Sequence, residues 1–404
     1  MRIAIDKWRP LGSVAFMTQT RRALVASALG AGISYANLAV ALPLLVLAEH
    51  GSAFFAGSLL GVNTVAFSLG ALAALFLRRA ESGVAVGLAA IAAGDLLLLT
   101  SPVRGALVAG ALVHGIGMGL FWVGVQASLG RRSGTTGSHR AFVLQYVVYI
   151  AGSAAGAALT GGSIALLRTV GVAHTTSIRL SFVVGAAASL VALPAAAAWL
   201  LGTVDVAPPS RLRPPPLRGF ALQLPDLLLV AAMGMLLNLA PVVLNDDFGL
   251  RPLAVGLVSG AVGAAKIGGS VTAGRIVHAA GSKRTVGAML GGSAVAAAVL
   301  AGTHQALLYI LLTVATAFLA IGVWPIVVDG ALARVSPEER PGLSIVWNVR
   351  EYAAIAATTA FGGYLLDVSA RPTLVLVLAS ALLASAAVSA LAVLGRPVYR
   401  PRAA

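Results

Sequence analysis

The sequence predicts an all-α integral membrane protein whose twelve transmembrane helices form two pseudo-symmetric six-helix bundles. Of the 404 residues, 59% are hydrophobic and only 10% are charged, and the mean hydropathy is +0.94. A soluble domain carries roughly 25% charged residues. Apolar runs long enough to cross a bilayer recur twelve times, and one basic, proline-rich break divides them into two sets of six. Lipid is therefore the solvent that this chain requires.

The predicted spans follow one another with short polar breaks, and each approaches the roughly 20 residues that a helix needs to cross the hydrocarbon core. They cover residues 23–48, 53–77, 83–100, 105–128, 141–166 and 179–201, then 224–245, 253–276, 285–302, 305–332, 342–366 and 373–394. Five prolines and three arginines occupy the break at 202–222. We therefore expect an N-terminal bundle at 1–201, a cytosolic linker at 202–222 and a C-terminal bundle at 223–404.

The basic residues predict the orientation. With the N-terminus in the cytosol, 21 of the 28 Lys and Arg residues lie on the inner side and five on the outer side, and Lys266 and Arg350 fall within spans. The positive-inside rule then predicts cytosolic termini and a location in the inner or plasma membrane. The net charge of +15 is explained by an anionic lipid leaflet, so no nucleic acid is expected. The excess of Arg over Lys, 25 against 3, indicates a bacterial source.

Several kinds of chemistry are excluded. The chain has no cysteine, and its six histidines are scattered without metal-ligand spacing. The segment around Lys266 resembles a phosphate-binding loop only faintly, because Ala265 precedes the lysine where such a loop has glycine. No nucleophile and base stand together. We therefore expect no cofactor, no metal and no enzymatic activity.

The two halves look duplicated. The triplet Asn37-Leu38-Ala39 recurs as Asn238-Leu239-Ala240, at an offset of 201 residues. Glycines follow in the same order at offsets of 199 to 204: Gly57 and Gly61 with Gly256 and Gly260, Gly83 and Gly87 with Gly287 and Gly291, Gly119 with Gly322, and Gly161-Gly162 with Gly362-Gly363. Such glycines let helices approach closely. Both copies begin inside, which is the parallel arrangement of transporters whose halves rock about a midplane site.

On these features the chain resembles the major facilitator superfamily. Its most specific match is the loop Gly274–Arg284, which is similar to the family's loop signature but has His278 where Asp is usual. The equivalent loop at 78–83 is degenerate. Span 4 keeps the family's glycines but has Ala111 where proton-coupled members often carry Arg, and span 5 has the glycines of the antiporter motif without its proline. The resemblance implies alternating access, and span 5 indicates antiport.

Charged side chains inside spans are the first candidates for function. A charge at the bilayer centre costs about 2.5–3.5 kcal/mol on insertion scales. Arg350 and Glu351 lie about ten residues into span 11, roughly 15 Å deep, and Lys266 lies at a similar depth in span 8. We expect Glu351 to take and release a coupling proton, with Lys266 or Arg350 controlling its proton affinity. A fixed ionic network that stiffens the C-terminal half is the alternative.

Two further sets of residues are candidates. Asp329, at the inner end of span 10, is expected to form a gating latch with the basic residues of the loop signature, Arg275, Lys283 and Arg284; an ordinary interfacial Asp is the alternative. Asp95 in span 3 is expected to be structural, with proton handling as the alternative. The predicted substrate cavity consists of Asn37, His114, Met118, Trp122, Gln126, Gln145, Tyr149, Asn238, Trp324, Trp347 and Asn348. Rings and amides of this kind suit an amphipathic organic molecule, and the alternative for each is helix packing or an interfacial belt.

The sequence thus predicts a monomeric secondary active transporter that moves a small organic molecule. Its partners are the substrate, protons and the lipid bilayer. Proton-coupled export is expected because the cavity set is aromatic and weakly charged. Proton-coupled uptake of a metabolite remains open, as does a membrane receptor or assembly factor of the same fold that transports nothing.

Overall fold

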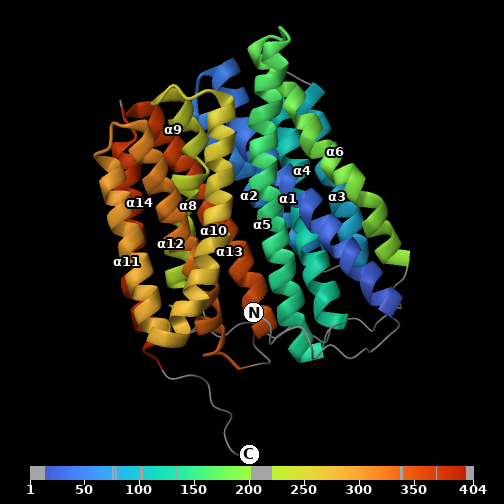
Figure 1. Ribbon diagram of the computed structural model, residues 1–404, viewed down its shortest axis with the longest axis vertical. Helices are drawn as coiled ribbons and strands as arrows, with labels where there is room; N and C mark the ends of the chain where they lie inside the picture. Colours follow the sequence, from blue (N-terminus) through green and yellow to red (C-terminus); the bar gives the residue numbers. More distant parts are fainter. Residues whose placement is uncertain are drawn as a thin grey trace, which may run out of the picture.

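The computed structural model of the 404-residue chain describes residues 14–74, 77, 80–100, 103–132, 134–201, 221–336, 340–369 and 371–396. Every regular element within these ranges is a helix. The inner N-terminal segment 1–13, the basic pair Arg78-Arg79 and residues 202–220 of the predicted linker lie outside them. Figure 1 shows the helices running together along the long axis of the molecule.

The N-terminal bundle contains six helices. They are α1 (Val14–His50), α2 (Ala53–Ala74), α3 (Ala80–Thr100), α4 (Arg104–Arg132), α5 (Gly134–Thr169) and α6 (His174–Leu201). Helix α1 packs against α5 and α6, while α4 packs against α2 and α3. Helices α1 and α5 begin earlier than the apolar runs that predict them, because each helix continues into the polar residues before its span.

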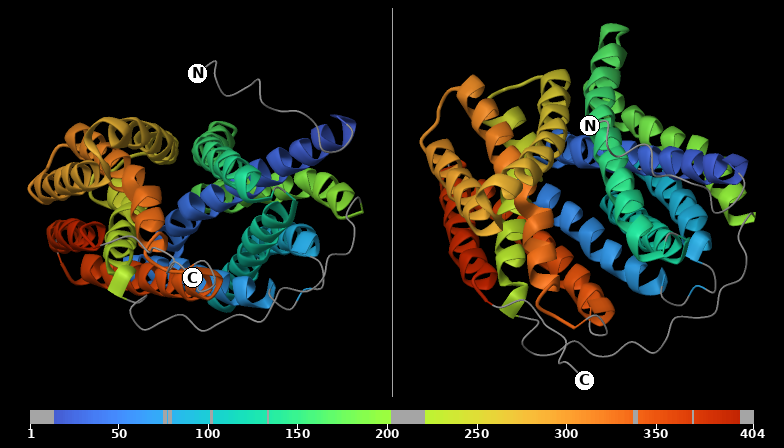
Figure 2. Two further views of the ribbon diagram at one scale, coloured as in Figure 1. Left: turned by 90° about the horizontal axis from the view of Figure 1, so that it is seen from below. Right: turned by 60° about the horizontal axis from the view of Figure 1, so that its bottom comes forward.

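The C-terminal bundle repeats this plan. It contains α8 (Leu224–Leu237), α9 (Ala240–Asp246), α10 (Pro252–Ala280), α11 (Ser282–Ala301), α12 (Ala306–Leu332), α13 (Arg340–Val368) and α14 (Thr373–Leu394). Helix α11 packs against α12 and α14, and α8 packs against α13 and α14. Figure 2 shows the two bundles side by side when the molecule is seen from below.

The predicted fold class of twelve membrane-crossing segments in two bundles is confirmed. Eleven segments of the described chain are long and apolar enough to span a membrane, and α8 with α9 counts as one of them. The twelfth, α13, is not among these eleven. It carries Arg350 and Glu351 in its middle and packs between α2 and α8. Polar residues within a span are tolerated where they face other helices instead of lipid.

The predicted span 224–245 crosses as one segment, Leu224–Asp246, but its helix is not continuous. The helix is interrupted at Asn238 and Leu239, and this separates α8 from α9. Pro241 is the physical reason, because a proline lacks the N–H that would bond to the carbonyl four residues earlier, and its ring clashes with that carbonyl. The interruption leaves Asn238 at the side of a cavity described below.

A repeated hydrogen bond supports the internal duplication. In the N-terminal half, Asn37 Nδ2 donates to Thr160 Oγ1 over 2.7 Å. In the C-terminal half, Asn238 Nδ2 donates to Thr359 Oγ1 over 3.1 Å. The two asparagines are 201 residues apart and the two threonines 199 residues apart. Each bond ties the first span of a half to its fifth span, so the two halves keep the same polar contact.

Large apolar side chains cover the outside of the molecule. Val191 on α6 is 80% exposed, Val388 on α14 is 70% exposed and Leu307 on α12 is 68% exposed. In water, exposed apolar area on this scale would favour aggregation. A lipid environment is the physical explanation for such a surface.

Candidate functional site

Two pairs of helices join the halves: α2 with α13, and α5 with α10. Glycine residues line both contacts. A Cβ atom added at Gly57 would lie 2.5 Å from the carbonyl oxygen of Thr359, and one added at Gly256 would lie 2.5 Å from that of Ala157. No side chain fits at such separations, so the backbones touch. Gly57 and Gly256 are duplicated residues, and the two helix pairs are therefore equivalent contacts.

These contacts lie toward the ends of the helices that the positive-inside rule places outside, which we call the outer ends. At the tip of α2, the carboxylate of Asp367 accepts hydrogen bonds from Ser52 Oγ (2.8 Å), Ala53 N (2.7 Å) and Phe54 N (3.0 Å). The positive end of a helix favours a negative charge. Asp367 of α13 thus caps a helix of the opposite half and fastens the outer ends together. Asp367 is not among the residues predicted from the sequence, and we call this contact the outer latch.

A cavity of about 90 Å³ lies between the halves, below the outer contacts. Its polar lining consists of Lys266 from α10, Asn238 from the α8–α9 interruption, Tyr35 from α1, Ser153 from α5 and Ser259 from α10. Two residues predicted from the sequence, Asn238 and Lys266, therefore meet in one cavity. Apolar residues of α1, α5, α8, α9 and α10 supply the rest of its wall.

A second polar group lies at the inner end of α8. Asp226 is fully buried in the first turn of this helix and accepts a hydrogen bond from Trp347 Nε1 of α13. One turn from Trp347 on the same helix, Arg350 Nη1 donates to Gln223 Oε1 over 2.9 Å. Glu351 interacts electrostatically with Asp226. Glu351 and Arg350, predicted as one group, thus lie beside Trp347, which was predicted as a cavity residue, and beside Asp226, which was not predicted.

Lys266 lies apart from the carboxyl group of Glu351. In the described part of the chain no ion pair joins Lys266 to Glu351. The electrostatic neighbours of Glu351 are Asp226, Tyr146 and Tyr352. The control of Glu351 by Lys266, expected from depth alone, has no direct contact to support it.

Aromatic rings line the space between the halves. The rings of Phe67 on α2 and Tyr352 on α13 are 4.0 Å apart between centroids. The rings of Tyr146 on α5 and Trp324 on α12 are stacked at 5.9 Å. Of these four, only Trp324 was predicted. Both contacts join opposite halves. Tyr352 follows Glu351 on α13, and Tyr146 also interacts electrostatically with it, so the carboxyl group of Glu351 lies among aromatic rings.

The remaining predicted cavity residues differ in their surroundings. Trp122 and Tyr149 form an edge-to-face pair with centroids 5.1 Å apart, and Tyr149 also faces Tyr35 of the cavity at 6.1 Å. Met118 is 1% exposed and packs in the N-terminal core. Gln145 is fully buried, and its amide atoms have no hydrogen-bond partner in the described structure. Gln126 and Asn348 are partly buried.

His114 and Asn37 both bond within the N-terminal half: His114 belongs to a network with Ser34, Asp95 and Asn63, while Asn37 bonds separately to α5 and α6. Ser34 Oγ donates to Asp95 Oδ2 over 2.6 Å and lies 3.2 Å from His114 Nε2, while Asn63 Nδ2 lies 3.0 Å from His114 Nδ1. All five side chains are buried. Asn63 Nδ2 also donates to the carbonyl of Ala111, which fixes the orientation of its amide. His114 Nδ1 must therefore accept, and the ring is neutral with its proton on Nε2.

This network joins α1, α2, α3 and α4 of one half and has no described contact with the other half. Asp95 is thus placed as expected of a structural residue. His114 and Asn37, predicted as cavity residues, lie in the packed core of the N-terminal bundle instead, where their polar atoms bind neighbouring helices.

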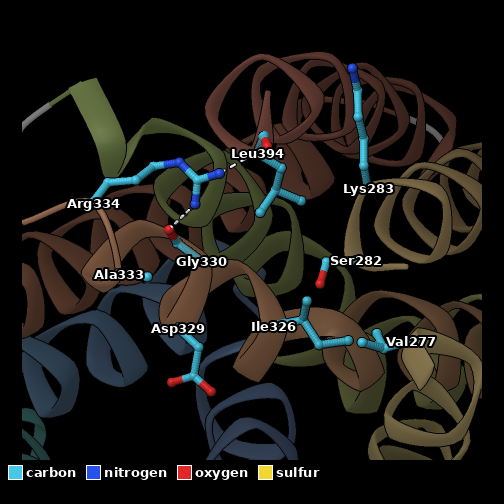
Figure 3. Close-up of a pocket in the computed structure, with 9 residues that line it drawn as sticks. All are labelled: Val277, Ser282, Lys283, Ile326, Asp329, Gly330, Ala333, Arg334 and Leu394. Atoms are coloured by element: carbon cyan, nitrogen blue, oxygen red, sulfur yellow. Dashed lines mark hydrogen bonds between the residues drawn. The ribbon is translucent and has the colours of Figure 1, made fainter. Parts of the chain in front are cut away.

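The inner end of the C-terminal half holds a larger pocket of about 550 Å³, lined among others by Lys283, Asp329 and Arg334 (Figure 3). The Arg334 guanidinium donates to the carbonyl oxygens of Gly330 and Leu394, and the carboxylate of Asp329 points away from it (Figure 3). Arg275 and Arg284 are exposed nearby on α10 and α11. The structure therefore brings Asp329 and Lys283 to one pocket.

The arrangement defines a class of protein: the chain has the fold of major-facilitator-type transporters. Three solved structures of this fold are similar to it over nearly the whole chain. They are the nucleoside transporter NupG (TM-score 0.69, 12% identity, 94% of this chain and 100% of that one), a POT peptide transporter (0.70, 13%, 93% and 93%) and a bacterial homologue of the human lysosomal transporter Spinster in an inward-facing, occupied conformation (0.67, 16%, 95% and 95%). No protein-family model and no curated protein matches the sequence.

Proposed function

We propose that this protein is a secondary active transporter of a small amphipathic organic molecule in the cell membrane, working as a monomer by alternating access. The observation that carries the proposal is the contact between the halves. Their outer ends are held together by Asp367 and by two helix pairs that approach closely at glycine residues. A cavity and the carboxyl group of Glu351 lie deeper in the same interface. A fold with one end of its interface fastened is suited to rocking about that interface.

The conformation is inward-facing in this proposal. The closest backbone contacts between the halves are at the outer end, at Gly57, Gly161, Gly256 and Gly363. Further in, the described contacts between the halves are made by rings, as at Phe67 with Tyr352. The predicted inner latch at Asp329, with Arg275, Lys283 and Arg284, lies wholly within the C-terminal half, so in this proposal it closes the opposite state only together with groups of the N-terminal half.

Proton coupling is assigned to Glu351 together with Asp226. Two carboxyl groups that interact inside the membrane cannot both be charged at low cost, so the pair retains a proton. Arg350 lies beside Glu351 on α13 and donates to Gln223 of the same half. Tyr146, which interacts electrostatically with Glu351, belongs to the opposite half, so rocking of the halves would move it and change the surroundings of the pair. Antiport with export of the substrate follows if the proton is released to the inner side and the substrate then binds from that same side.

Transport into inverted vesicles tests this proposal. Purified protein is reconstituted, a pH gradient is imposed, and uptake of a panel of labelled amphipathic compounds is followed. Glu351→Gln and Asp226→Asn should abolish gradient-driven uptake, whereas Asp247→Asn, at an exposed carboxyl group after α9, should leave it unchanged. Uptake only in right-side-out vesicles would instead establish the alternative, proton-coupled import.

The accessibility of introduced cysteines distinguishes a receptor that transports nothing from both an exporter and an importer. The chain has no native cysteine, so single cysteines can be introduced without a background. Positions beside Asp329 and beside Asp367 should each become reactive in one state and protected in the other. Labelling that never changes at either end would reject alternating access.

A further inference from the structure

Lys266 lies at the midpoint of α10, Pro252–Ala280, and lines the cavity between the halves. At 1.5 Å per residue, about 21 Å of helix extend on either side of it, so the ammonium lies near the centre of the bilayer. A lysine at this depth that faces a cavity marks a pathway or a binding site more often than a packing position.

The ammonium has no counter-charge. Among the described residues none forms an ion pair with Lys266. The other polar side chains of the cavity are neutral, and two of them donate their hydrogen bonds elsewhere: Ser153 Oγ to the carbonyl of Tyr149, and Asn238 Nδ2 to Thr359 Oγ1. Asp226 and Glu351, the nearest candidates from the sequence, interact with each other and with α5 and α13.

An anion from outside the chain would complete this site. We propose that Lys266 binds the carboxylate of an amphipathic organic monocarboxylate, which is then the substrate class of the transport function proposed above. A single ammonium is a point charge with three donors and matches one negative charge, while a phosphate dianion would leave a second charge without a partner. A cavity of about 90 Å³ has the volume of roughly three water molecules, enough for a carboxylate head group.

The surroundings indicate where the rest of the molecule lies. Tyr35 lines the cavity, faces Tyr149 at 6.1 Å and is linked through it to Trp122. On the other wall the cavity is lined by Val258 and Val262. A ring or a short aliphatic chain attached to the carboxylate would contact these groups. The ligand is therefore amphipathic, with its charge at Lys266 and its apolar part toward the tyrosines.

Matched pairs of ligands test the charge requirement. Binding of benzoate, phenylacetate and 3-phenylpropionate to the purified full-length protein is measured by calorimetry, each against its neutral amide. The wild-type protein should bind the carboxylates about tenfold more tightly. Lys266→Gln should remove this preference, Lys266→Arg should keep most of it, and Arg251→Gln, at an exposed arginine directly before α10, should keep all of it. Amides that bind as well as the acids, or no binding of any acid, would overturn the proposal.

A second readout does not need a ligand. Because Lys266 has no partner, Lys266→Gln should raise the melting temperature of the ligand-free protein by removing a buried charge. A fall in melting temperature, or failure to fold, would mean that Lys266 stabilises the fold by pairing and would also overturn the proposal.

The transport function and the anion site can fail separately. Carboxylate binding that depends on Lys266, without any uptake in vesicles, would leave the site in place and reject transport. Gradient-driven uptake of neutral compounds that Lys266→Gln does not change would leave the transporter in place and reject the anion site.

Discussion

The two halves place their buried polar groups differently, although they share one ancestral pattern. In the N-terminal half, Ser34, Asp95 and His114 bind one another inside a single bundle. In the C-terminal half, Glu351 lies against Tyr146 of the opposite bundle, and Lys266 lines the cavity between the bundles. Polar groups enclosed in one rigid body keep their partners when the halves move. Groups at the interface change partners, and they are therefore the ones suited to coupling movement to binding.

The duplicated asparagines show the same difference on a small scale. Asn37 is fully buried and donates to Thr160 and to the carbonyl of Ser181 (2.9 Å). Asn238 is partly buried, makes the equivalent bond to Thr359 and lies beside the cavity. The same residue type thus makes a buried structural bond in one half and lines the cavity in the other.

The largest expected effect separates these two asparagines. Asn37→Ala should lower the free energy of unfolding by about 3 kcal/mol, because buried polar partners lose their hydrogen bonds, whereas Asn238→Ala should cost about 1 kcal/mol. Unfolding of both variants in the same detergent gives the comparison. Equal losses would show that the two bonds are equally buried and would remove the distinction between the halves.

A smaller effect is expected at a duplicated glycine. A Cβ at Gly87 would lie 2.6 Å from the backbone nitrogen of Phe121, while nothing lies within 4 Å of a Cβ at its counterpart Gly291. Gly87→Ala should therefore destabilise the protein by about 2 kcal/mol through overpacking, and Gly291→Ala should be neutral or slightly stabilising because alanine favours the helix. Thermal unfolding measures both. Loss of stability in Gly291→Ala would contradict the open packing there.

Much of this fold follows from the sequence because the relevant signals are local. Apolar length sets the spans, basic residues set the orientation, and the glycine order exposes the duplication. The interruption of the seventh span was also within reach, since Pro241 stands inside it. A proline alone does not predict an interruption, however, because Pro43 and Pro194 are accommodated within α1 and α6.

The site was less predictable because its partners are distant in sequence. Asp226 and Trp347 are 121 residues apart, and Asp367 binds residues more than 300 positions away. Both aspartates stand near a span end, where an acidic residue ordinarily faces water. Only the packing of α13 against α2 and α8 shows that they are held between helices. His114 was misplaced for the converse reason: a polar stripe along α4 does not reveal which neighbour it faces.

The smallest expected effect tests the asymmetry of the outer contacts. Asp367 fastens α13 to α2, but the position duplicated in α5 is Leu166, which is 65% exposed, so the α5–α10 pair has no equivalent latch. Asp367→Asn should weaken three charge-assisted bonds by about 1.4 kcal/mol in total and shift the population of the outward-open state about tenfold. A cysteine at Gly161, buried against α10 in the closed state, should then react faster with a membrane-impermeant reagent from outside. Because that cysteine itself crowds the contact, its rate is compared with and without Asp367→Asn, and equal rates would show that glycine packing alone keeps the outer end closed.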